Sequence, residues 1–264
     1  MYKTEEHMVH ITGITNQKGG VGKSSTALAL GYALTHIKAR ALVIDLDPQG
    51  NVSYSLNADH QIGSIYDVLI GEKQITDVIQ KNGPVHCVRA DPSLAGADTV
   101  LTKTGKEYRL KEALVEIYSN YDFIIIDTPP TLGILTINAL AACNDIIIPS
   151  QADMYSLQGI SQLQQTIEVI KKYCNSTLKV LGILITRFNP RIVLNREIVT
   201  AIEELAIKFE TKVFNTRIRE SVVIRESQAE QADLFTYIGK GNAVIDYIDF
   251  TGEYLGATNG KKEL

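Results

Sequence analysis

One short stretch carries the residues of this chain that are best suited to hold a phosphate. Residues 16–25 read Asn-Gln-Lys-Gly-Gly-Val-Gly-Lys-Ser-Ser. Glycines let a main chain close around an anion, and the free N–H groups at a helix start carry a partial positive charge. In such a loop Lys23 reaches the β- and γ-phosphates of a nucleotide, Ser24 ligates Mg²⁺ and Ser25 bonds the α-phosphate. The neighbouring phosphate contacts are expected at Gly19, Gly20, Val21 and Gly22.

The loop departs from the usual phosphate-loop pattern at one position. Where that pattern has a glycine this chain has Gln17, and a second lysine, Lys18, follows it. Because Lys23 already serves the nucleotide of its own chain, Lys18 is predicted to meet a phosphate elsewhere. The alternative is a chance glycine-rich turn with a solvated lysine. The apolar run before the loop and the helical spacing after it disfavour that alternative.

Two aspartates follow apolar runs and supply carboxylates for the same site. Asp47 lies just beyond the run at residues 41–44, and Asp127 directly follows the run at 123–126. A carboxylate at Asp47 would order the attacking water or a water on Mg²⁺, while Asp127 would hold the Mg²⁺ through water, opposite Ser24. The alternative for Asp47 is a cap of the Asp-Pro turn that it opens.

The elements that position these residues alternate along the chain. We expect strands at residues 9–15, 41–44, 85–90, 123–126, 145–149 and 180–186, and helices at 22–36, 64–71, 106–118, 132–142, 157–173, 195–209 and 242–254. Continuous apolar strands between helices predict an α/β fold, with a doubly wound, mostly parallel sheet covered on both faces. No linker or composition break divides residues 1–264, so we expect one domain, with an ordered core at about 9–255 and a flexible tail at 256–264.

Composition narrows the classes of function. Hydrophobic residues make up 45% and charged residues 21% of the 264 residues, which is ordinary for a globular protein. No apolar run approaches the ~18 residues that span a bilayer. The net charge is −4, yet residues 171–240 hold 12 Lys and Arg against 8 Asp and Glu, so the basic part lies toward the C-terminus. Cys87, Cys143 and Cys174 are isolated and read as core thiols in a reducing compartment.

Three strings together resemble the deviant Walker A ATPases of the ParA/Soj and MinD group. They are the loop at 16–25, DLDPQGN at 45–51 and DTPP at 127–130. The resemblance implies a P-loop NTPase fold of the SIMIBI/MinD-like type, with ATP and Mg²⁺ as cofactors and ATP hydrolysis as the reaction. It also implies an ATP-dependent homodimer in which Lys18 crosses to the partner's nucleotide, with Lys18, Lys23 and Asp47 as catalytic residues.

The same resemblance extends to residues further along the chain. Residues 131–133 would sense the γ-phosphate, and Asn189 would contact the adenine, although a plain turn asparagine is the alternative. Family members usually carry proline where this chain has Ile218, so the resemblance does not define the geometry around the adenine. Nonspecific DNA binding is implied for the basic half of the chain, with the contacts expected at Arg187, Arg191, Arg196, Arg219 and Arg225.

The resemblance favours a DNA-segregation role within this group. A ParB-like, centromere-binding protein would stimulate hydrolysis, and the chain would be cytoplasmic and nucleoid-associated. About eight residues precede the first expected strand, which predicts the short form without an N-terminal helix-turn-helix domain, and the C-terminal segment lacks the basic amphipathic helix of a membrane ATPase. Two alternatives stay open: a DNA-independent ATPase that positions a protein cargo, and a P-loop metabolic enzyme acting on a small molecule.

Overall fold

The computed structural model describes residues 9–81, 83–237 and 241–258. A seven-stranded sheet runs through the molecule in the order β3-β2-β4-β1-β5-β6-β7, and every pairing between these strands is parallel. The strands are β1 (His10–Ile14), β2 (Ala41–Asp45), β3 (His86–Val88), β4 (Phe123–Asp127), β5 (Asp145–Gln151), β6 (Lys179–Phe188) and β7 (Val213–Arg219). The expected doubly wound, parallel α/β architecture is confirmed.

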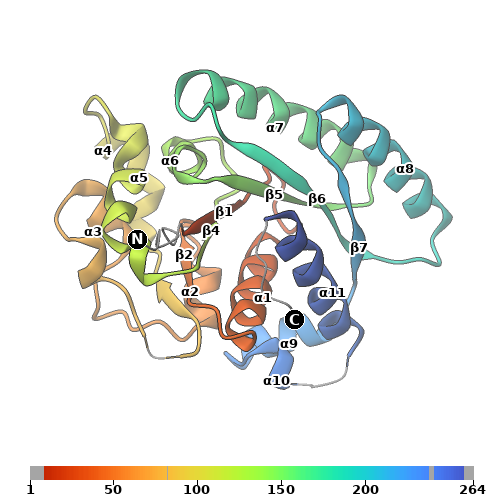
Figure 1. Cartoon of the computed structure of the whole chain (residues 1–264), viewed down its shortest axis with the longest axis horizontal. Coiled ribbons are helices and arrows are strands. Elements are labelled where there is room, and N and C mark those ends of the chain that lie inside the picture. Colours follow the sequence, from red (N-terminus) through yellow and green to blue (C-terminus); the bar gives the residue numbers. More distant parts are fainter. Residues whose placement is uncertain (1–8, 82, 238–240, 259–264) are drawn as a thin grey trace, which may run out of the picture.

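Helices cover both faces of this sheet (Figure 1). One face packs against α1 (Lys23–His36), α2 (Asn51–Ser55), α9 (Val222–Ala229), α10 (Leu234–Tyr237) and α11 (Asn242–Ala257). The other packs against α3 (Ile65–Ile70), α4 (Ala97–Val100), α5 (Arg109–Leu114), α6 (Ile134–Ala142), α7 (Met154–Tyr173) and α8 (Val193–Lys208). Within the described ranges, none of these helices combines the length and the apolar character needed to cross a membrane.

The sheet can bind a layer of helices on each face because successive side chains of an apolar strand point to opposite faces. In β4, Ile124 and Ile126 join the core under α5 and α6, whereas Phe123 and Ile125 join the core under α1 and α11. All five residues of β4 are buried, including its terminal Asp127. The central strands therefore end in a common edge, where the loops that follow β1, β2 and β4 meet.

Several elements differ from the sequence-based expectation. The strand β7 and the helix α9 were not predicted, because β7 buries only Phe214 and Ile218 and its alternation is weak. The helix expected at 106–118 is α-helical only over α5, with 3₁₀ turns on either side. α11 continues through Ala257, so residues 256 and 257 are helical rather than part of a flexible tail, and residues 259–264 lie outside the described part.

Candidate active site

The predicted phosphate loop connects β1 to α1. Gly20 and Gly22 adopt φ values of +74° and +86°, a left-handed region in which a side chain is strained and which therefore favours glycine. Gly22 is the N-cap of α1, and no side chain caps this helix start. The first N–H groups of α1 are thus available to an anion, as the glycine-rich sequence predicts.

Neighbouring strands brace this loop from outside. The Asn16 side chain donates to the Pro149 carbonyl oxygen at 2.7 Å and accepts from the Lys18 N–H at 2.9 Å. The Thr186 hydroxyl, on β6, donates to the Val21 carbonyl oxygen at 2.8 Å. These bonds within the chain hold the loop to β5 and β6.

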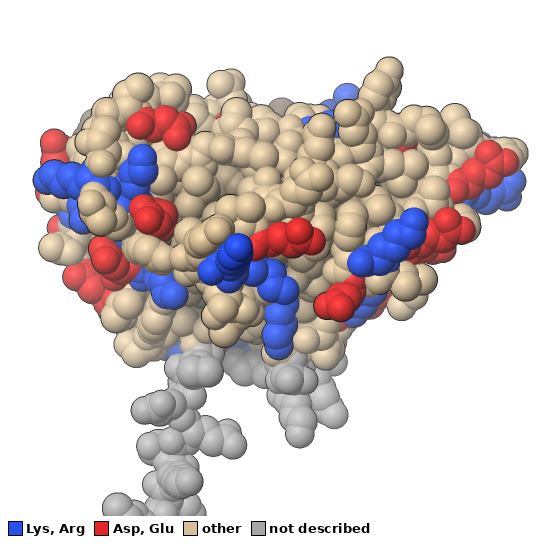
Figure 2. Space-filling view, turned by 90° about the horizontal axis from the view of Figure 1, so that it is seen from above, with Lys and Arg blue, Asp and Glu red and all other residues tan. Residues whose placement is uncertain are grey.

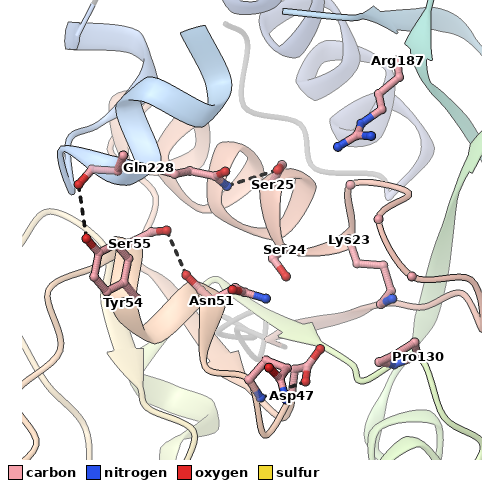
Figure 3. A pocket seen from close by; sticks show the side chains of 15 residues that line it. Lys23, Ser24, Ser25, Asp47, Asn51, Tyr54, Ser55, Pro130, Arg187 and Gln228 are labelled. Carbon is pink, nitrogen blue, oxygen red and sulfur yellow. Dashed lines mark hydrogen bonds between the residues drawn. The ribbon is translucent and has the colours of Figure 1, made fainter. Parts of the chain in front are cut away.

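A cavity of about 420 Å³ lies over this loop and is large enough for a nucleotide. Figure 3 shows Lys23, Ser24 and Asp47 around it, with Arg187 on the side away from Asp47. The predicted Gly19, Gly20, Gly22 and Ser25 line it as well, whereas Val21 is buried beneath it. Residues that were not predicted complete the lining: Gln49, Asn51, Tyr54, Ser55, Pro130, Gln228 and Ala229.

The charged groups of the site lie close to one another and are largely buried. Lys23 is 7% exposed; burial lowers the pKa of its ammonium group, and the carboxylates of Asp127 and Asp47 act against that shift. Burial, followed by the charge of Asp45, raises the pKa of Asp127 well above its ordinary value, and the Ser24 hydroxyl and Lys23 do not compensate. Among the described residues, the site therefore holds one buried cation, Lys23, beside the three carboxyl groups of Asp45, Asp47 and Asp127.

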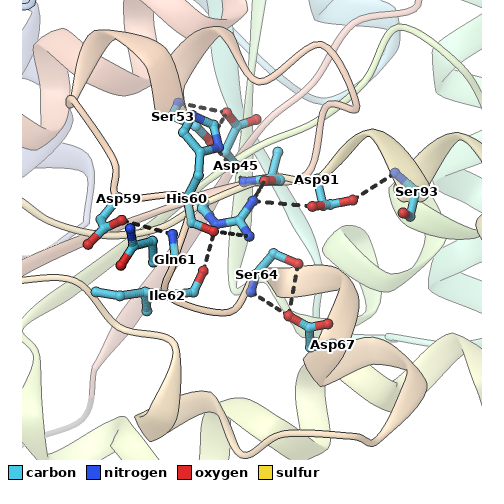
Figure 4. A network of polar contacts seen from close by, with 12 residues as sticks. Asp45, Ser53, Asp59, His60, Gln61, Ile62, Ser64, Asp67, Asp91 and Ser93 are labelled. Atoms are coloured by element: carbon cyan, nitrogen blue, oxygen red, sulfur yellow. Dashed lines mark hydrogen bonds and ion pairs between the residues drawn. The ribbon is translucent and has the colours of Figure 1, made fainter.

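A polar network beneath the site fixes the turn that carries Asp47, and Figure 4 shows the part of this network around Asp45 and Ser53. The Asp45 carboxylate accepts from the Asp47 N–H at 3.1 Å and from the N–H and hydroxyl of Ser53 at 2.8 and 2.7 Å. Burial raises the pKa of Asp45 to about 6 despite these bonds. The Ser53 hydroxyl also accepts from the Ala90 N–H at 2.8 Å, and the buried Arg89 next to it donates to the Ile62 carbonyl oxygen at 2.8 Å.

The Asp47 side chain also caps its own turn. Its carboxylate accepts from the Gln49 N–H at 3.0 Å, as the turn-capping alternative predicts. The same side chain lines the cavity and is 7% exposed. Both roles are therefore compatible with the geometry, and the role in hydrolysis stays a prediction.

The residues present fit a magnesium nucleotide. Both carboxylate oxygens of Asp127 are buried without a well-formed hydrogen bond among the described residues. No cluster of three His, Cys, Asp or Glu side chains within those ranges could hold a metal alone. This suits Mg²⁺, which binds through one or two protein ligands together with waters and phosphate oxygens. Ser24 would ligate the ion directly, and Asp127 and Asp47 would hold its waters; the ion would supply positive charge to the phosphates.

Lys18 takes no part in lining the cavity. Its ammonium group forms an ion pair with Asp153, the N-cap residue of α7, and its side chain is 30% exposed. Burial alone would raise the pKa of Asp153, but the hydrogen bond and charge of Lys18, together with bonds from Ser156, lower that pKa overall. The Lys18 carbonyl oxygen accepts from the Lys23 ammonium at 3.3 Å. The two lysines of the loop thus point to different surroundings.

The remaining predicted residues lie near the ends of β6 and β7. Arg187, Arg219 and Arg225 line a small depression of about 50 Å³ that adjoins the main cavity at Gly22 and Ser25. Asn189 lines neither; its side chain accepts from the Arg191 N–H at 3.0 Å, as a turn asparagine does. Adenine contact by Asn189 therefore stays a prediction without support from this geometry.

Long-range packing brings Gln228 into the site. It lies on α9, and its side-chain amide donates to the Ser25 hydroxyl at 3.1 Å (Figure 3). The neighbouring α2 contributes Tyr54, whose ring is 59% exposed, and Asn51. Asn51 ends the DLDPQGN string and could have been found from it, but nothing in the sequence pattern indicates Gln228 or Tyr54.

Comparison with known proteins identifies relatives over nearly the whole chain. A protein-family model described as an AAA domain matches residues 9–180. The sporulation initiation inhibitor protein Soj of Bacillus subtilis is 38% identical over 96% of this chain and 100% of its own length. The chromosome partitioning protein ParA of Myxococcus xanthus is 37% identical over 92% of this chain and 86% of its own length.

A solved structure has the same fold and a bound nucleotide. It is described as a cobyrinic acid a,c-diamide synthase from Mycobacterium smegmatis with ADP and magnesium; it is 31% identical, and the alignment covers 97% of this chain and 98% of that one with a TM-score of 0.84. The same protein was crystallised with an ATP analogue and magnesium. The chain is accordingly an ATPase with the P-loop fold, and ATP and Mg²⁺ are its cofactors. These likenesses, with the loop geometry above, place the chain in the ParA/Soj family of P-loop ATPases.

Proposed function

We propose that this protein is a DNA-partition ATPase that forms an ATP-dependent sandwich homodimer. The observation that carries the proposal is the position of Lys18, which belongs to the phosphate loop but lies outside the cavity that this loop forms. A lysine there does not face the nucleotide of its own chain, and in a face-to-face dimer it would meet the phosphates of the second copy. The relatives named for chromosome partitioning support this role.

The proposal includes nonspecific DNA binding by the arginines near the ends of β6 and β7. Arg187 and Arg225 are exposed beside the nucleotide cavity, and Arg191 and Arg196 are exposed on the segment from β6 into α8. Arg219 is already bonded to the Asp246 carboxylate through its Nε, at 3.0 Å. On the described part of the face seen in Figure 2, positive and negative side chains are interspersed, which does not favour that face for DNA. Dimerisation would double the number of arginines that reach phosphates.

Binding to random-sequence duplex DNA tests this function. We expect binding with ATP·Mg²⁺, but not with ADP or without nucleotide. Because phosphate contacts release counterions, the affinity should fall steeply between about 50 and about 200 mM salt. The Arg191→Ala variant should lower the slope of log affinity against log salt by about one, and Lys111→Ala should not. Absence of binding in every nucleotide state would contradict the DNA-partition role and leave the ATPase in place.

A second prediction concerns the ion pair that holds Lys18. The Asp153 carboxylate accepts from the Ser156 N–H at 3.0 Å, and in the Asp153→Asn variant the amide oxygen can still accept this bond. The variant loses only the negative charge that holds Lys18 in the ion pair. We expect ATP-dependent dimers to form at a lower protein concentration, because the ion pair with Asp153 no longer competes for Lys18. If that ion pair contributes ~1.4 kcal/mol, the dimer dissociation constant should fall about tenfold. Sedimentation velocity measures this. Dimerisation that is unchanged, or that is weaker, would show that Asp153 does not compete for Lys18.

After dimerisation, a ParB-like centromere-binding protein would stimulate hydrolysis and release the DNA. In this scheme the protein would be cytoplasmic and associated with the nucleoid. The M. smegmatis relative favours a second candidate, an enzyme that uses ATP to amidate a small carboxylate, because of the activity in its description. ATP turnover that depends on such a carboxylate, and not on DNA, would support this alternative.

A further inference from the structure

A second cavity lies away from the nucleotide site, between α3 and the segment that joins α4 to α5. Its volume is about 280 Å³, and part of its lining is aliphatic, including the buried Leu69 and Leu101 and the half-exposed Val100. The cations Lys103, Lys106 and Arg109 also line it, and none of the described residues that line it is acidic. The cavity therefore combines an apolar lining with three positive charges.

The guanidinium of Arg109 is fixed against the end of α3. Its Nε donates to the Leu69 carbonyl oxygen at 3.1 Å, and a Cβ placed on Gly71 would lie only 2.5 Å from its Nη2. Among the described residues, neither Arg109 nor Lys103 nor Lys106 forms an ion pair. A guanidinium that is oriented in advance and retains free N–H groups suits a carboxylate.

The chain segment around the cavity also carries a net positive charge. Residues 100–112 hold four Lys and Arg against two Asp and Glu. The aliphatic lining distinguishes the cavity from a simple anion site, because phosphate and the DNA backbone offer no apolar group to fill it.

We propose that this cavity is a docking site for a partner protein and that it binds a segment in which acidic residues alternate with aliphatic ones. An aliphatic side chain would enter between Leu69 and Leu101, and the neighbouring carboxylates would meet Arg109 and the two lysines. Charge complementarity of this kind favours an acidic segment of a partner protein. It disfavours a second copy of this chain that would present its basic, DNA-binding arginines to the cavity.

The segment from α4 to α5, which borders the cavity on one side, is tied to α6 by two hydrogen bonds. The Asp98 carboxylate, on α4, accepts from the Ile134 N–H at 2.9 Å, and the Asn138 side chain donates to the Lys106 carbonyl oxygen at 2.9 Å. α6 begins directly after residues 131–133, the expected γ-phosphate sensor. The docking site is therefore also an effector site, in which partner binding displaces the start of α6 through Asp98. The docking site and its effector role do not depend on the proposed role in DNA partition.

Fluorescence anisotropy with a labelled peptide of alternating Leu and Glu tests the docking site on the full chain. We expect Lys106→Glu to weaken binding at least about tenfold, since it replaces a charge-assisted hydrogen bond by repulsion. Lys111→Glu is the matched control, with the same charge change five residues along, and should bind as the parent does. Lys103→Glu, at an exposed position, serves if Lys106→Glu fails to fold.

Three results would overturn the docking site. Equal binding of the peptide with Gln in place of Glu would remove the charge argument. Displacement by inorganic phosphate, together with equal binding of a peptide with Ser in place of Leu, would indicate an anion site only. Loss of DNA binding in Lys106→Glu, but not in Lys111→Glu, without any peptide binding would assign the cavity to the DNA surface. The peptide assay contains no DNA, so its failure is distinct from a failure of the proposed function.

Amide NMR of the same complex tests the connection to α6. The peptide should shift the resonances of residues 102–106 together with those of Gly133 and Ile134. In Asp98→Ala the first group should still shift and the second should not, because the bond from Ile134 to Asp98 is absent. Shifts confined to residues 102–106 in the parent chain would overturn the effector role.

Discussion

Replacing Lys23 by alanine is expected to abolish the stabilisation that ATP·Mg²⁺ gives to this protein. A ligand at about 1,000 times its Kd adds about 4 kcal/mol to the free energy of unfolding, and the variant should gain close to none of it at the same concentration. Lys23 is buried beside Asp127 and Asp47, and it is the only one of the loop's two lysines that lines the cavity. Without it, two carboxylates would face the phosphates with no side-chain cation from the loop between them.

Chemical unfolding with and without ATP·Mg²⁺ measures this effect, and a fluorescent ATP analogue measures the affinity directly. Lys18→Ala is the matched control, because the same substitution in the same loop removes a lysine that points away from the cavity. The control should bind ATP like the parent chain and fail to dimerise. A Lys23→Ala protein that binds the analogue with unchanged affinity would exclude Lys23 from the site.

The part of the site that could be predicted from the sequence is the part made by local chain segments. A glycine-rich turn between a strand and a helix brings Lys23, Ser24 and Ser25 to one anion without help from elsewhere in the chain. Asp47 and Asp127 follow buried strands, and parallel strands end at a common edge of the sheet, so their convergence could also be expected. The pairing of β2 with β4 confirms that these two strands lie side by side.

What could not be predicted depends on contacts between distant segments. Gln228 meets Ser25 across more than 200 residues of chain, on a helix whose short amphipathic pattern gave no clear signal. The ion pair of Lys18 with Asp153 likewise joins the loop to the start of α7. Arg219 was expected at a DNA surface, but it is bonded to Asp246 of α11. A charge pattern shows that a residue is basic, but it does not show which carboxylate packing brings beside it.

Asp47→Asn is expected to separate nucleotide binding from hydrolysis. The asparagine oxygen can still accept from the Gln49 N–H, and Asp45 can still accept from the N–H of residue 47, so the turn should keep its shape. What is lost is the negative charge that would order the attacking water if Asp47 acts in hydrolysis, and removing such a group typically lowers the rate by about 10²- to 10⁴-fold. ATP binding should stay intact, and the ATP-bound dimer should accumulate.

Single-turnover phosphate release, followed together with sedimentation, distinguishes the two roles of this aspartate. Asp47→Ala removes the turn cap as well as the charge, so a role in the turn alone predicts that alanine impairs the protein while asparagine does not. A role in hydrolysis predicts equally slow phosphate release from both variants, with dimers that persist in ATP. If Asp47→Asn turns ATP over within about tenfold of the parent rate, the loss is well short of that typical of a catalytic acid or base. Asp47 would then be a turn cap only, and the water-ordering group would be sought among the other polar residues that line the cavity.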